Sequence, residues 1–169
     1  MLERVVEQAA LDLRAVEGAE GAGLLRAVLG LDPGHAAAHA ELGLLRLRAL
    51  DCAAALGHFE SSIGRAPEGL VASTGLALLL ATHPAETVRD APRSLELAAS
   101  AVAIHGRTPI TLRSLAAAEA ALGRFPEAEV LLEEAIELAG VLGQESLLPM
   151  LDKMKSAYGK GNGWRFPCR

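Results

Sequence analysis

Aromatic residues are scarce in this sequence. Its 169 residues include three Phe, one Tyr and one Trp, although 51% of the residues are hydrophobic. A chain of this length can bury one substantial core. With so few large rings, Ala and Leu must fill it, and both favour helices that approach one another closely. No segment shows the β-branched alternation of a strand, so the composition predicts an all-α fold.

Long apolar runs are also missing. No stretch of 18 uncharged apolar residues occurs, so we expect no segment that spans a membrane. The most apolar stretch, Gly69 to Thr82, is short and is interpreted as a buried helix. Near the N-terminus, Glu3, Glu7 and Asp12 interrupt the apolar residues, so a secretory signal is not expected either.

Positive charge is in deficit, since the formal net charge is −5 and the sequence pI is about 5.5. Such a chain repels a phosphate backbone at long range, so nucleic acid is not an expected partner. Cysteine is equally sparse: Cys52 and Cys168 lie 116 positions apart with no CxxC motif. This spacing predicts neither a disulfide framework nor a zinc knuckle, and a reducing compartment, the cytoplasm, is the simpler interpretation.

What the sequence does contain is an internal repeat. The stretch Leu115 to Ala139 holds two amphipathic helical patterns joined by a short turn, and its small and apolar residue types recur at a spacing of 34. Prolines keep the same spacing, from Pro33 to Pro67 and from Pro92 to Pro126. Self-similarity at this period is typical of helix–turn–helix units stacked side by side.

The repeat predicts about four helix pairs followed by a capping helix. The pairs cover residues 2–35, 36–69, 70–108 and 109–142, the cap covers 143–158, and the tail 159–169 is expected to be irregular. About five residues are inserted in the third pair, at Thr82 to Asp90, and lengthen its turn. Trp164 and Phe166 in the tail are candidates to dock back onto the cap.

Capping and proline signals place several helix ends. Asp51 is expected to cap a helix over Cys52 to Arg65, and Pro92 to lie in the first turn of a helix that runs to His105. Pro149 is expected to delay the start of the last helix.

The residue types at matching positions resemble the tetratricopeptide repeat family. In the second pair the matching residues are Leu42, Gly43, Ala55, Phe59 and Pro67. In the fourth pair they are Leu115, Ala116, Gly123, Ala128, Leu132 and Ala135, and in the third Leu76, Ala77, Ser94, Ala98 and Ala101. The insertion and the basic-aromatic tail resemble the terminal repeats of larger bacterial members, so the chain is either a small stand-alone member or the C-terminal piece of a longer protein.

The resemblance implies a right-handed solenoid of antiparallel helix pairs forming one domain over residues 1–158. Gly43 and Ala55, like Ala116 and Ala128, are expected to face each other where the two helices of a pair cross. A residue larger than Ser at such a position is expected to force the helices apart, at a cost of roughly 1 to 3 kcal/mol.

In this family the first helix of each pair lines a concave groove. The resemblance therefore implies an adaptor that binds a peptide or amphipathic helix of a partner protein in a largely apolar groove. The groove positions most expected to touch the partner are Leu44, Leu47, Arg48, Val71, Thr74, Leu78, Ile110 and Arg113. The alternative is a self-associating scaffold, a homo-oligomer in which the end helix or tail of one copy fills the groove of another.

Catalytic and metal motifs give no comparable signal. His35 and His39 have the spacing of two ligands on one helix face, but no HExxH motif or third ligand accompanies them, so no metal site is predicted. Cys52 stands where the family often has an aromatic residue, and is interpreted as a small buried hydrophobe. The family's cationic clamp for acidic chaperone peptides lacks its cations here. We therefore expect no enzyme activity and no cofactor.

Overall fold

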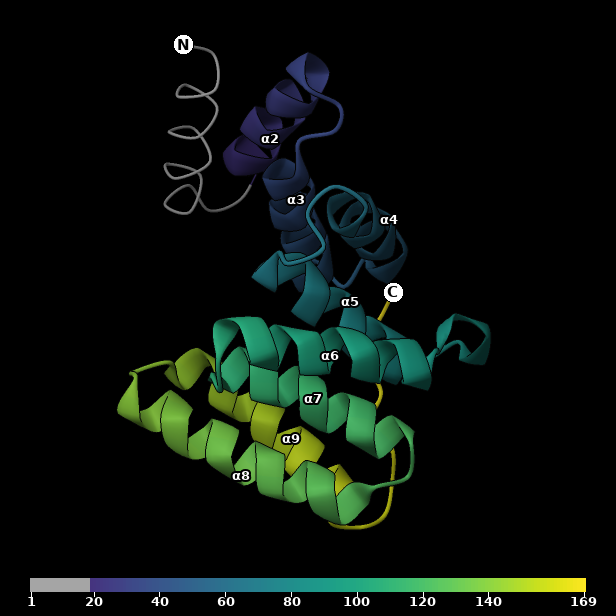
Figure 1. Cartoon of the computed structure of the whole chain (residues 1–169), viewed down its shortest axis with the longest axis vertical. Coiled ribbons are helices and arrows are strands. Elements are labelled where there is room, and N and C mark those ends of the chain that lie inside the picture. The colour runs from purple at the N-terminus through teal and green to yellow at the C-terminus, as the bar shows by residue number, and fades with distance from the viewer. Residues whose placement is uncertain (1–18) are drawn as a thin grey trace. The chain divides into compact units, whose positions relative to one another are not determined.

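The computed structural model describes residues 19–169, and in these residues every regular element is a helix (Figure 1). The predicted all-α class is thereby confirmed. The helix expected within residues 2–18 lies outside the described residues. The described chain divides into two compact units, unit 1 (residues 19–72 with Arg169) and unit 2 (residues 73–168).

Unit 1 contains three helices and the first residues of a fourth. They are α2 (Ala19–Leu31), α3 (Ala36–Arg48), α4 (Cys52–Ile63) and the start of α5 (Leu70–Thr82). Helix α3 packs against both α2 and α4. Two side chains cap these helices: His35 accepts from the backbone N–H of Ala38 at 3.1 Å, and Asp51 accepts from that of Ala54 at 3.2 Å, as predicted for Asp51.

The contact between α3 and α4 depends on a glycine. A Cβ atom on Gly43 would lie 2.5 Å from two ring atoms of Phe59, whose side chain is completely buried. Ala55, on the same helix as Phe59, is also completely buried. The sequence predicted that this position tolerates residues up to the size of Ser. That limit was wrong, because the Phe59 ring occupies the space that even a methyl group needs.

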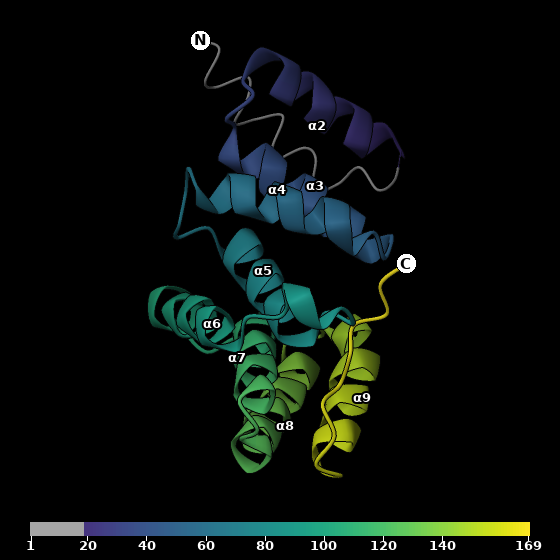
Figure 2. The same cartoon turned by 90° about the vertical axis from the view of Figure 1, so that its right-hand side faces the viewer.

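Unit 2 contains the remaining helices, of which α6, α7 and α8 lie side by side in sequence order (Figure 2). They are the rest of α5, η1 (Glu86–Val88), α6 (Ala91–His105), α7 (Pro109–Ala121), α8 (Phe125–Val141), η2 (Glu145–Leu147) and α9 (Leu148–Tyr158). Helix α9 packs on α8. None of the helices in residues 19–169 combines the length and hydropathy that a membrane span requires.

Small residues let the helices of unit 2 approach closely. Ala77, Ala98 and Ala118, one each from α5, α6 and α7, form a cluster in which each is completely buried. Two buried serines reinforce it: Ser94 donates to the carbonyl of Ala77 at 2.7 Å, and Ser114 to that of Thr74 at 3.1 Å. Their short side chains fill small-residue positions and satisfy their own hydroxyl groups.

Local signals placed the helix starts in unit 2 correctly. The insertion forms a loop with a short 3₁₀ turn, and Pro92 lies in the first turn of α6, which ends at His105. Pro149 lies in the first turn of α9, after the separate 3₁₀ turn η2. Proline suits these positions because the first N–H groups of a helix have no partner within it.

The tail has no regular structure from residue 162 onward, yet part of it is docked. Phe166 is 4% exposed, and its N–H donates to the carbonyl of Thr82 at 2.9 Å. The Trp164 ring meets the Phe166 ring edge to face, with centroids 5.8 Å apart. This backbone contact is with the end of α5, whereas the sequence suggested docking on the cap.

Candidate partner-binding residues

The residues predicted to touch a partner fall in both units. Leu44, Leu47 and Arg48 lie on α3, and Val71 lies at the start of α5, all in unit 1. Thr74 and Leu78, on α5, and Ile110 and Arg113, on α7, belong to unit 2.

Burial separates these residues into two groups. Leu47, Thr74 and Leu78 are 6%, 2% and 0% exposed, so they are buried and do not present a surface. Leu44, Val71, Ile110 and Arg113 are partly exposed, and Arg48 is exposed. The sequence could not separate the groups because α5 is apolar around its whole circumference, a pattern typical of a helix buried on all sides.

Arg113 is the most unusual of these residues. Its Nε atom is buried without a hydrogen-bond partner, and its Nη1 atom lies 3.9 Å from the sulfur of Met150 on α9. No acidic residue in the described part of the chain forms a salt bridge with it. Burial lowers the pKa of the Arg113 guanidinium to about 10, so the group is still charged at neutral pH.

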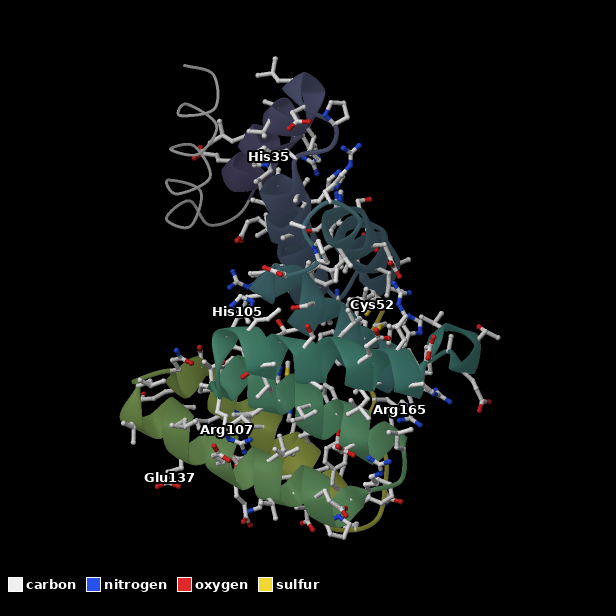
Figure 3. All side chains as sticks on the ribbon, in the orientation of Figure 1. His35, Cys52, His105, Arg107, Glu137 and Arg165 are labelled. Atoms are coloured by element: carbon white, nitrogen blue, oxygen red, sulfur yellow. The ribbon has the colours of Figure 1, made fainter. Side chains whose placement is uncertain are left out.

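Other cations of unit 2 have acidic partners. Arg107, labelled in Figure 3, lies just before α7. Its guanidinium donates to both carboxylate oxygens of Glu134 on α8, which makes a two-pronged salt bridge. This hydrogen bonding lowers the pKa of the Glu134 carboxyl. Arg124 pairs with Glu119 at 2.9 Å, and Lys155 pairs with Glu133 at 3.0 Å. These salt bridges are at the surface. Arg113 differs from these cations because it is more deeply buried and has no salt bridge with an acidic residue of the described chain.

A pocket of about 270 Å³ lies where the tail passes the ends of α5 and α7. Arg89 and Arg165 border it together with Ala81, Ala120 and Phe125. The Arg89 guanidinium is already used, because it donates to the carbonyls of His83 and Pro84 and so holds the insertion together.

The bonding state of both cysteines differs from the one that the sequence predicted. Cys52 and Cys168 are each disulfide-bonded, so the interpretation that they form no disulfide was wrong. Cys52 is 1% exposed, which agrees with its predicted burial. Sequence spacing carries no signal for such a bond, because disulfide formation depends on the distance between Cα atoms in the folded chain.

The histidines are arranged differently from the pair considered in the sequence. His35 is occupied in capping α3 (Figure 3). His39 instead contacts His58 of α4, with the two Nδ1 atoms 3.1 Å apart, and its Nε2 atom lies 3.0 Å from the carbonyl oxygen of Pro33. Sequence spacing missed His58 because it lies on the neighbouring helix.

Burial lowers the pKa of His58, and the nearby His39, Arg46 and Arg26 lower it further, while Asp51 opposes them. Above the ordinary pKa of 6.5, His58 is neutral in both the folded and the unfolded chain. As the pH falls through 6.5, the unfolded chain takes up the proton first, so stability declines until the lower folded pKa is reached.

The thermal unfolding midpoint is therefore expected to fall between about pH 7.5 and about pH 5.5, and His58→Gln is expected to reduce that fall. Circular dichroism at both pH values measures it. His105→Gln, at the end of α6, is the control and should behave like the unsubstituted chain. A His58→Gln variant with an undiminished fall would contradict the assignment.

Comparison with protein-family models, curated proteins and solved structures found no match to this chain. The resemblance to the tetratricopeptide repeat family therefore depends on the residue types at matching positions of the 34-residue repeat.

Proposed function

We propose that this chain is a non-enzymatic protein-interaction module of the tetratricopeptide type, a right-handed solenoid that binds a peptide or helix of a partner protein. Within unit 1 the helices α3 and α4 pack as a pair, and within unit 2 the helices α7 and α8 do so, both as the repeat predicts, which supports the proposal. The Gly43–Phe59 contact and the Ala77, Ala98 and Ala118 cluster support it further, because such solenoids need small residues where helices cross.

The observation that carries the proposal is the unpaired guanidinium of Arg113. Burial costs this cation hydration that no acidic residue of the described chain replaces: its Nε atom has no hydrogen-bond partner, and its Nη1 atom lies 3.9 Å from the weakly accepting sulfur of Met150. Ile110, one turn earlier on α7, is partly exposed and provides an apolar contact beside it. The partner that fits is an amphipathic segment with apolar anchors and a carboxylate that reaches Arg113.

The test compares capture of native proteins by the tagged full chain and by two variants. Arg113→Met keeps the length and apolar stem of the side chain but removes its charge, so capture of the specific partner is expected to fall at least about tenfold. Arg124→Met is the matched control, because Arg124 is an exposed arginine with a partner, Glu119, in the chain itself. Equal capture by both variants would reject the role of Arg113.

A self-associating scaffold is the second candidate, and the docked tail favours it. Phe166 shows that unit 2 accepts a tail segment, and exchange of such a segment between copies would link them. Light scattering on the full chain and on a chain ending at Tyr158 tests this. A defined oligomer that is lost on truncation supports the scaffold, whereas monomers in both cases exclude it.

We propose no catalytic role and no cofactor for this module. Its location in the cytoplasm stays a prediction from the sequence. The disulfide-bonded state of Cys52 and Cys168 argues against that location, because disulfides persist mainly in oxidising compartments.

A further inference from the structure

Two histidines of unit 1 have the separation of two ligands on one metal ion. His39 lies on α3 and His58 on α4, and their Nδ1 atoms are 3.1 Å apart. A Zn²⁺ ion binds imidazole nitrogen at about 2.0 to 2.1 Å with tetrahedral geometry, which places two such nitrogens roughly 3.3 Å apart. The observed separation is thus close to what one shared ion requires.

The hydrogen bond of His39 determines which of its nitrogens is available. The carbonyl oxygen of Pro33 only accepts hydrogen bonds, so the Nε2 atom that lies 3.0 Å from it must carry a proton. In the neutral ring, the Nδ1 atom of His39 then has a free lone pair directed at His58. Histidines that bind metals typically donate their other N–H in this way, which fixes the ring and makes the ligand nitrogen more basic.

Without a metal, the Nδ1–H of His58 donates to the Nδ1 atom of His39. Metal binding requires that His58 move this proton to its own Nε2 atom, so that both Nδ1 lone pairs face the ion. This shift between neutral tautomers needs no strong base. It also makes metal binding detectable, because the proton of His58 moves from Nδ1 to Nε2 only if the pair binds a metal ion.

The charged residues around His39 and His58 have opposing effects on metal binding. Arg26 and Arg46 favour the neutral form of His58, which is the form that binds metal, but they also repel a cation. Asp51 offsets part of this repulsion, although it lies 3.6 Å from Arg46 and is partly neutralised by it. With two protein ligands, and water completing the coordination, binding is expected to be moderate rather than tight.

We propose that His39 and His58 form a binding site for a divalent transition-metal ion of the zinc type, which links α3 to α4. The site is independent of the proposed partner binding, because neither histidine is among the residues predicted to touch the partner. Imidazole ligands suit Zn²⁺, Ni²⁺ and Cu²⁺, and Zn²⁺ is the probe chosen here because it has no redox chemistry.

The first experiment titrates Zn²⁺ into the untagged full chain, freed of metal with a chelator, and follows the heat of binding. One ion per chain is expected at about pH 7.5, and His39→Gln and His58→Gln should each weaken binding at least about tenfold. His105→Gln is the control, because it removes a histidine of unit 2. Thermal unfolding of each metal-free variant confirms that it is folded.

The second experiment observes the histidine rings directly by long-range ¹H–¹⁵N NMR. Without metal, His39 should carry its proton on Nε2 and His58 on Nδ1, and Zn²⁺ should shift the His58 proton to Nε2. Binding should also weaken towards about pH 5.5, because protons then compete for the same nitrogens. No binding at one ion per chain, or binding that both glutamine variants retain, would overturn the proposal.

Discussion

Gly43→Ala is expected to lower the free energy of unfolding by about 1 to 3 kcal/mol, the usual cost of overpacking a core. Alanine normally stabilises the interior of a helix relative to glycine, by roughly 0.5 to 1 kcal/mol. At Gly43 the steric effect dominates, since the new methyl group would lie 2.5 Å from two atoms of the completely buried Phe59 ring. Chemical denaturation followed by far-ultraviolet circular dichroism measures the change.

Gly57 provides the matched control within the same pair of helices. It lies on α4, and a Cβ atom there would meet nothing within 4 Å, so Gly57→Ala should raise stability by roughly 0.5 to 1 kcal/mol. The cost of Gly43→Ala should also shrink in a Phe59→Leu background, because the smaller side chain leaves room for the methyl group. If both glycine variants are stabilised alike, α3 and α4 do not cross at Gly43.

Arg113→Met is expected to have opposite effects on stability and on partner binding. Removing a partly buried, unpaired charge while keeping an apolar side chain of similar length should raise the free energy of unfolding by about 1 kcal/mol. The same change should lower capture of the partner at least about tenfold. A residue that reduces the stability of the free protein but is needed for binding is typical of a functional site rather than of a packing position.

Arg124→Met is the control that shows whether the effects of Arg113→Met come only from the loss of one positive charge. Arg124 is exposed and pairs with Glu119, so its replacement should change stability by no more than about 0.5 kcal/mol in either direction. Thermal or chemical unfolding of both variants under identical conditions gives the comparison. A clear destabilisation by Arg113→Met would show that the guanidinium has a stabilising contact in the free chain.

The sequence by itself determined the helical class and most helix boundaries in the described residues. Pro92 and Pro149 lack an N–H group, and Asp51 caps a helix with its side chain, so each acts on its nearest neighbours in the chain. Such local effects can be predicted because the interacting atoms are only a few residues apart. The sequence also predicted a small residue at Gly43, but it did not show that even alanine is too large there.

The tertiary structure alone decided which candidate residues reach a surface and which polar groups meet. Leu78 and Ile110 both occupy predicted groove positions, yet Leu78 is completely buried and Ile110 is partly exposed. The pairing of His39 with His58 and the isolation of Arg113 likewise depend on which helices lie together. The physical reason is that burial and charge pairing are set by neighbours from distant parts of the chain, which a local pattern of residues does not specify.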